Sequence, residues 1–558
     1  MAFTYDEQEF LTDEDLQISV LGHWPEIKIE NPELKELFES EYGRDFIGGD
    51  ELIAHRQALV AKEMSFDELE ADILRTREKT KKSIQETVFA KTATGIGRGH
   101  SMGGLSGVVL GLHGTKMIDS GLTGFVSSRA LATSGRRRTV KESDIVVPVS
   151  ISKREDLLKE YLEISRQAFN ESKTFKETFG RLGGIESFNK ALAYNNPADL
   201  FIVLPLDTMA TLAFEVRQDG TNPNGPFLPK EMYDLVGKFP EIADEVGIGT
   251  MYKQRINVPR QGYFHYNVFK DPDALNYALE LAEELGMPLK PKIVNSSINI
   301  TQGFTKRLEN LKGILEQTRT ITNPKELQEE AMRYMMEASD FSQEYNESVG
   351  VTVLDSLSFR VWSEQKRHGT LRQNVESIYS AARRAVNRVK ESWSEIEAAY
   401  EGKEVNLPIK DLEEVIVIDG RMKKNPELLV PYVYHTARQL MFFDKLEKEG
   451  LSPRDAAFVI PRNVRTVNLE NYDLTNLISL ELPLRLCQEC EPERYQTSWR
   501  KRSLIVKEVP ELNPIIQPKC AVGYCSEIKF CGHIKPLKDS YDEELHEAVK
   551  DVRLGLSR

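Results

Sequence analysis

The sequence predicts an α+β chain, in which short buried strands alternate with longer amphipathic helices. Apolar runs of strand length, each containing or ending at a proline, occur at residues 145–149, 200–205 and 457–461. Other stretches repeat apolar residues every three or four positions, which is the spacing of a helix with one buried face. These helical stretches cover residues 153–172, 273–285, 359–400 and 433–449.

The chain is too long for one hydrophobic core. It has 558 residues, whereas a single core rarely grows beyond about 250–300 residues. We expect a helical N-terminal extension, a first unit, a loop and helical insertion, a second unit and a cysteine-rich tail. The expected boundaries are 1–92, 93–215, 216–335, 336–505 and 506–558.

The composition is that of an ordinary globular protein, with 40% hydrophobic and 29% charged residues. A formal net charge of −14 argues against a broad nucleic-acid surface but leaves room for a local phosphate pocket. No apolar run approaches the roughly 18 residues of a membrane helix, and the acidic start does not resemble a signal peptide. We therefore expect a cytoplasmic protein without a membrane or nucleic-acid partner.

The front of the chain changes character sharply near residue 95. Residues 32–39 and 66–74 show helical periodicity, and residues 95–124 are rich in glycine and almost uncharged. The spacing of Gly95, Gly97 and Gly99 does not match a dinucleotide-binding fingerprint. The alternative to a functional role for the glycines at 95–104 is a turn-rich surface segment.

The segment Arg367-His368-Gly369, followed ten residues after Arg367 by Ser377, is the most informative stretch. Arginine forks and hydroxyl groups are the side chains that bind a phosphate best. Ten residues are nearly three turns of a helix, so both side chains would line one face if the stretch were helical. The alternative is the solvated basic face of a long helix.

This stretch resembles the Arg-His-Arg-x7-Ser signature of the flavin-dependent thymidylate synthase family, with Gly369 in place of the second arginine. Arg485 resembles a late arginine of that family that holds the pyrimidine ring. The resemblance implies that the second unit binds substrate and flavin through separate sets of residues. The substrate set is Arg367, Asn374, Ser377 and Arg485, and the flavin set is His368 and Asn476, with Asn471 as the alternative to Asn476.

The first half of the chain resembles the opening of the same family. Gly99-His100-Ser101 is similar to a Gly-His-Glu-Ser motif whose histidine contacts the flavin, whereas the arginine signature is reduced to Ser127-Ser128-Arg129. The resemblance implies flavin contacts for His100, Ser101, Arg129, Arg136 and Arg138. It also implies a tandem of two units that share one composite site, and a homodimer that imitates a tetramer.

The activity that the resemblance implies is reductive methylation of dUMP to dTMP. FAD would be the cofactor, with methylenetetrahydrofolate and NADPH as co-substrates. Two alternatives stay open: one-carbon transfer to another pyrimidine or nucleic-acid base, and a non-catalytic protein that binds a nucleotide or flavin. Gly369, the reduced first signature and the Glu491-Pro492 pair favour the non-catalytic alternative.

All five cysteines lie after residue 486, which indicates one local site rather than a disulfide framework. Four thiolate or imidazole ligands suit tetrahedral zinc, and close pairs bring two ligands together at once. Buried thiols or an iron–sulfur cluster are the alternatives. The candidate zinc ligands are Cys487, Cys490, Cys520, Cys525 and Cys531.

Overall fold

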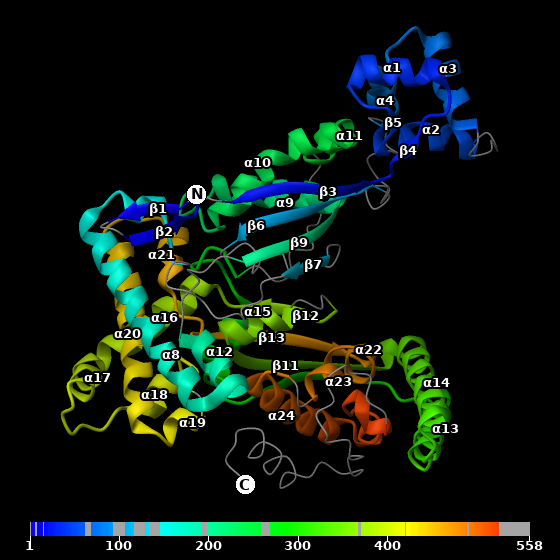
Figure 1. The fold of residues 1–558 in the computed structure, drawn as a ribbon. Helices are drawn as coiled ribbons and strands as arrows, with labels where there is room; N and C mark the ends of the chain where they lie inside the picture. The colour runs from blue at the N-terminus through cyan, green and yellow to red at the C-terminus, as the bar shows by residue number, and fades with distance from the viewer. Residues whose placement is uncertain are drawn as a thin grey trace. The chain divides into compact units, whose positions relative to one another are not determined.

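The computed structural model confirms a mixed α+β chain that divides into two compact units (Figure 1). Unit 1 comprises residues 1–160, 195–264 and 450–458, and unit 2 comprises residues 161–194, 265–449 and 459–558. Within those bounds the structure describes residues 2–5, 8–14, 16–61, 68–92, 106–115, 129–132, 145–191, 198–257, 268–366, 370–418, 420–487 and 490–523. Across these ranges, no helix is both long enough and apolar enough to cross a membrane.

Unit 1 is built on a four-stranded antiparallel sheet with the order β3-β6-β9-β7. The strands are β3 (Gln17–Trp24), β6 (Gly107–Thr115), β9 (Ala198–Pro205) and β7 (Arg129–Ala132). On the buried face, Leu110 lies opposite Ile202 and Leu112 opposite Leu200. This face of the unit 1 sheet is therefore apolar across β6 and β9.

The N-terminal helices of unit 1 have a small core of their own. They are α1 (Pro32–Tyr42), α2 (Gly49–Ala61), α3 (Leu69–Thr80) and α4 (Ile84–Thr92). Asn31 caps α1 by accepting hydrogen bonds from the amides of Glu33 and Leu34, and Pro32 occupies the first turn. Leu34, Phe38 and Ile53 are among the buried residues of this region.

Further short strands and helices complete unit 1. The strands are β1 (Ala2–Tyr5), β2 (Gln8–Thr12), β4 (Ile27–Lys28), β5 (Phe46–Ile47) and β8 (Val146–Val147). The helices are α7 (Val149–Ser152), α9 (Leu206–Gly220), α10 (Lys230–Glu245), α11 (Gly249–Arg255) and α21 (Pro453–Ala456). The long helix α8 (Glu155–Ala191) begins in unit 1 and continues in unit 2.

Unit 2 contains a second four-stranded antiparallel sheet, with the order β10-β11-β13-β12. The strands are β10 (Lys292–Ile298), β11 (Val349–Ser358), β13 (Arg465–Asp473) and β12 (Arg372–Val375). In each unit, the sheet places its first, second, fourth and third strands along the chain side by side. The two sheets therefore have the same strand order and the same antiparallel pairing.

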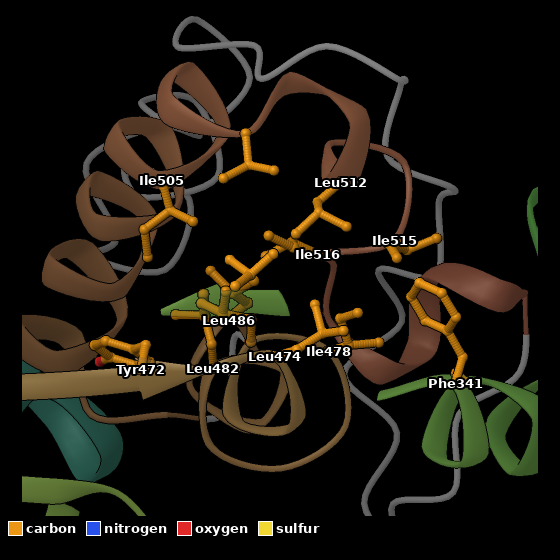
Figure 2. Packing of buried hydrophobic residues seen from close by; sticks show 14 of the residues in the cluster. Phe341, Tyr472, Leu474, Ile478, Leu482, Leu486, Ile505, Leu512, Ile515 and Ile516 are labelled. Atoms are coloured by element: carbon orange, nitrogen blue, oxygen red, sulfur yellow. The ribbon is translucent and has the colours of Figure 1, made fainter. Parts of the chain in front are cut away.

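Helices cover both faces of the unit 2 sheet. On one face, Ala278 and Ala282 of α12 (Tyr277–Leu285) pack against Leu354, Val467 and Leu469. The opposite face forms a core cluster in which apolar side chains of several helices gather around the end of β13 (Figure 2). These helices are α13 (Gln302–Arg319), α14 (Pro324–Glu344), α22 (Leu474–Ile478), α23 (Glu481–Arg485) and α24 (Pro492–Glu508).

The remaining helices of unit 2 connect β11, β12 and β13 or follow α24. The α-helices are α15 (Phe359–Gln365), α16 (Ile378–Glu391), α17 (Trp393–Tyr400), α18 (Ile409–Glu413), α19 (Gly420–Lys423) and α20 (Pro426–Lys448). Of the 3-10 turns, η4 (Asn346–Ser348) precedes β11, and η7 (Pro510–Leu512) and η8 (Lys519–Val522) follow α24. The turn η6 (Ala457–Val459) crosses the boundary, with Ala457 and Phe458 in unit 1 and Val459 in unit 2.

The structure differs from the sequence predictions at four places. The N-terminal region has strands at β1–β4 rather than helix alone, and β6 lies within the glycine-rich stretch 95–124, where no strand was predicted. The apolar run at 457–461 is mainly a 3-10 turn, so by sheet position β13 is the counterpart of β9. Finally, β12 interrupts the expected helix over 359–400.

Candidate functional site

Two predicted site residues meet the signature segment, defined here as residues 365–370, at its two ends. Arg485 donates from Nη2 to the carbonyl oxygen of Gln365, at 3.2 Å. Asn476 donates from Nδ2 to the carbonyl oxygen of Thr370, at 3.1 Å. Residues 367–369 lie outside the described residues. The two contacts place Thr370, which follows them, beside α22 and Gln365, which lies just before them, beside α23.

The turn from β13 into α22 fixes the position of Asn476. The side chain of Asp473, the last residue of β13, accepts hydrogen bonds from both the backbone amide and Nδ2 of Asn476. This is an N-cap, which compensates for a helix's unpaired first amides. Leu474 and Leu477 are buried in the core cluster and hold the first turn of α22 against the sheet.

Arg485 belongs to a closed ring of polar contacts, called here the polar ring. Its Nε lies 2.8 Å from Glu481 Oε1, and Nη2 of Arg494 lies 3.3 Å from the same oxygen. Nη1 of Arg494 lies 3.5 Å from Glu470 Oε1. Gln365 closes the ring through two different groups. Its side-chain amide nitrogen donates to Glu470 Oε1 at 2.5 Å, and its backbone carbonyl oxygen accepts from Arg485.

A buried lysine extends the polar ring beneath the sheet. Nζ of Lys501 lies 2.6 Å from Glu470 Oε2 and 2.9 Å from Asp355 Oδ2, and Tyr472 donates its hydroxyl proton to Glu470 at 2.6 Å. Burial raises the pKa of Glu470, but Lys501 and Arg494 outweigh burial and lower it to about 2. Burial also raises the pKa of Asp355, against the opposing effect of Lys501. Glu470 is therefore a carboxylate at neutral pH.

Asn374 lies on the other face of the sheet. Across β12 and β13, Gln373 pairs with Glu470 and Asn374 pairs with Leu469, so alternation directs Asn374 away from the polar ring. Its Oδ1 instead accepts from the amide of Ala278 in α12, at 3.4 Å. The structure thus does not bring Asn374 together with Arg485, although both were predicted to contact the pyrimidine.

Ser377 immediately precedes α16 rather than lying within the helix expected to contain Arg367. Its hydroxyl donates to the carbonyl oxygen of Lys270, at 2.7 Å, and its side chain is buried. Because β12 lies between Arg367 and Ser377, their spacing does not represent three turns of one helix. A shared helix face therefore cannot be the basis of a joint role for the two residues.

Most of the predicted flavin-binding residues cannot be placed. His100, Ser101, Arg136, Arg138 and His368 lie outside the described residues. Arg129 is the first residue of β7, where it pairs with Val203 of β9. The roles assigned to these residues therefore remain predictions.

The cysteines are only partly described. Cys487 and Cys490 follow α23 in a turn, where the amide of Cys490 donates to the carbonyl oxygen of Cys487 at 3.0 Å, and Cys520 lies in η8. Cys525 and Cys531 lie outside the described residues. Among the residues that the structure does describe, no three histidine, cysteine or acidic side chains are grouped to hold a metal ion. The zinc site stays a prediction.

The sequence reasoning missed most of the polar ring. Gln365, Glu470, Glu481 and Arg494 were not predicted as site residues, and neither was Lys501. One signal was available in the sequence. Asn468 and Glu470 alternate with the apolar residues Val467, Leu469 and Tyr472 in a strand that is buried. A charged residue inside a buried strand needs a partner.

Unpaired polar atoms beside the signature segment suit a ligand with N–H groups. Asn476 Oδ1 and Thr370 Oγ1 are buried, and within the described part of the chain neither has a hydrogen-bond partner. A buried acceptor without a donor is costly, by about 1–3 kcal/mol. A flavin or a uracil ring carries an imide N–H that would satisfy such an acceptor, so the residues present fit either group.

Comparisons with known proteins point to one family. No protein-family model matches the chain. The flavin-dependent thymidylate synthase of Thermococcus onnurineus (strain NA1) is 33% identical over 157 residues, which is 27% of this chain and 61% of that protein. The synthase of Thermococcus kodakarensis is 32% identical over 124 residues (21% and 50%), and that of Pyrococcus horikoshii 33% over 129 residues (22% and 52%).

The chain spans between half and about three fifths of the length of these curated relatives. The matched stretch also covers only about a quarter of this chain, so much of the chain has no counterpart in these comparisons. All three relatives carry the same name, which is the family that the signature, Arg485 and the Gly-His motif resemble. These comparisons confirm the resemblance: over the matched stretch, this chain is similar to the flavin-dependent thymidylate synthases.

Proposed function

We propose that unit 2 binds dUMP and a flavin beside the signature segment, and that it catalyses reductive methylation of dUMP to dTMP. Methylenetetrahydrofolate would donate the carbon and NADPH would reduce the FAD. The observation that carries this proposal is the pair of hydrogen bonds from Arg485 and Asn476 to the two ends of the segment. The relationship to the thymidylate synthases supports the choice of substrates.

Each of these side chains has a chemical task in the proposal. Arg485 offers N–H donors to a pyrimidine carbonyl, and Arg367 offers a guanidinium fork to the phosphate. The Oδ1 atom of Asn476 accepts an imide N–H. The flavin, when bound, supplies the hydride that completes the methyl group.

Positive charge near the segment supports anion binding. Lys366 is buried, with its ammonium 4.7 Å from the centroid of the Trp362 ring. Charges at such buried positions interact more strongly with a phosphate than charges in water do.

We further propose that the two units arose by duplication and that unit 2 carries the chemistry. The shared strand order supports the duplication. Counted back from the C-terminal end of each strand, Ile202 of β9 occupies the position of Glu470 in β13. By the same count, the paired apolar residues Leu112 and Leu200 occupy the positions of the paired residues Asp355 and Asn468. Unit 1 therefore has no counterpart of the polar ring at these positions, and we assign it the supporting flavin contacts of His100 and Ser101. Two such chains would form the proposed homodimer.

The test is a visible spectrum of the purified protein with added FAD, followed by titration with dUMP. Flavin bands that shift on dUMP addition support the site, and dTMP formation with methylenetetrahydrofolate and NADPH supports the reaction. Bound flavin and nucleotide without turnover would favour the non-catalytic alternative. A protein that binds neither FAD nor dUMP would contradict the proposal.

His100→Ala offers a matched check on the flavin assignment, since His113 in β6 supplies a control histidine. We expect His100→Ala to lose flavin and His113→Ala to retain it. Equal flavin content in both variants would remove His100 from the proposed site.

A further inference from the structure

Glu481 lies between two arginines and is almost completely buried, with 1% of its side chain exposed. We infer that Glu481 is a positioning residue that fixes the orientation of Arg485, and through it sets the preference for uracil over cytosine nucleotides. This inference rests on the proposed function of unit 2. It adds a role for a residue that does not itself contact the substrate.

The geometry gives Arg485 two anchors on different edges of its guanidinium plane. Glu481 holds the Nε edge at 2.8 Å, and the carbonyl oxygen of Gln365 holds Nη2 at 3.2 Å. A guanidinium has five N–H donors in a rigid planar fork, so anchors on two different edges fix the orientation of its plane. Without Glu481, Arg485 would lose the anchor at its Nε edge.

The rest of the polar ring keeps Glu481 itself in place. Glu481 and Arg485 lie one turn apart in α23, and Arg494 of α24 approaches the same carboxylate oxygen from the next helix. Arg494 is in turn directed toward Glu470, which accepts the side-chain amide of Gln365. The orientation of Arg485 is thus determined by residues of α15, β13, α23 and α24 together.

A fixed guanidinium discriminates between pyrimidines because it can only donate hydrogen bonds. Uracil presents a carbonyl oxygen at C4, whereas cytosine presents an amino donor there. A donor edge held in one direction meets an acceptor in uracil and a second donor in cytosine. Sites built around such a fixed polar contact reject the mismatched ligand strongly, whereas an arginine free to rotate does not.

The experiment measures binding of dUMP and dCMP to the full-length flavin-loaded protein by calorimetry. The variants are Glu481→Ala, Glu481→Gln and, as a matched control, Glu414→Gln, which alters the half-exposed ion pair with Arg388 outside the polar ring. We expect Glu481→Ala to bind dUMP about tenfold more weakly and dCMP almost unchanged. Glu481→Gln should retain most of the preference, because its amide oxygen still accepts from Nε of Arg485.

A double variant separates positioning from a structural role. If Glu481 acts through Arg485, then adding Glu481→Ala or Glu481→Gln to Arg485→Ala has no further effect on dUMP affinity. Thermal unfolding identifies variants that fail to fold, and Glu481→Gln keeps the test valid if Glu481→Ala unfolds. Wild-type preference in Glu481→Ala, or additive losses in the double variant, would overturn the inference alone. If the wild type binds no pyrimidine nucleotide, the proposed function fails with it.

Discussion

At the scale of single residues, the contact between Arg485 and the signature segment depends on the shape of the guanidinium. A lysine keeps the charge but cannot bond Glu481 and the Gln365 carbonyl from two edges at once. We expect Arg485→Lys to weaken dUMP binding by about 1.5–3 kcal/mol, or roughly ten- to hundredfold. Calorimetric titration checks this, with Arg388→Lys as a surface control; equal affinity in Arg485→Lys and the wild type would contradict it.

Gly369 is the residue at which the signature departs from the family pattern. Restoring the arginine adds a cation at a proposed phosphate contact, which we expect to tighten dUMP binding by roughly tenfold or more. Gly313→Arg adds the same charge at an open position of α13 and serves as the control. If both variants bind dUMP equally well, position 369 does not contact the phosphate.

The resemblance to the family singled out Arg485 and Asn476, and the structure brings both to the signature segment. Residue chemistry also singled out Asn374, which the structure does not bring there. Its chemistry suits a pyrimidine, but the register of β12 against β13 directs it toward α12. One position along a strand changes the face, and the sequence did not show where β12 begins.

At the scale of elements, α24 is joined to the sheet by Lys501. Removing its ammonium would leave Glu470 and Asp355 buried without their shared cation. We expect Lys501→Met to lower the free energy of unfolding by about 3–5 kcal/mol. Lys507→Met, on the exposed part of the same helix, should change it little. Chemical denaturation of both variants makes the comparison, and similar midpoints would argue against a structural role for the buried lysine.

Helices were easier to predict from the sequence than strands. The expected helices at 32–39, 153–172 and 433–449 are all found, because helical periodicity and capping are local properties. By contrast, β6 has glycines at its start and middle, and β13 alternates polar and apolar residues although both of its faces are covered. Their pairing partners lie far away along the chain, and local patterns do not contain that information.

At the scale of the whole molecule, Glu470 should make folding stability depend on acid. Its pKa falls from the ordinary 4.5 to about 2 in the folded protein, so the unfolded chain binds the proton more readily. The contribution of its ionised form, roughly 3 kcal/mol, is therefore present above about pH 4.5 and is lost as the pH falls toward 2. Glu470→Gln should show a shallower loss of stability over this range. Parallel acid-unfolding curves for variant and wild type would refute this.

The difference between the two sheets predicts one nucleotide site per chain. Unit 1 has Ile202 where unit 2 has Glu470, so we expect only unit 2 to bind dUMP. Calorimetry with excess ligand should give one dUMP for each chain. A ratio of two would show that unit 1 has kept a site of its own.

The similarity between the two sheets also bears on how the protein is synthesised. The central strand pair of unit 2 joins distant residues such as Thr352 and Asn471, which are separated by 119 positions. The ribosome releases β11 and the signature segment well before β13, α23 and α24. Until those last elements emerge, β11 lacks its central partner and Gln365 lacks Glu470. During translation the growing chain therefore exposes an unpaired sheet edge, which is a template for pairing with other chains until β13 emerges.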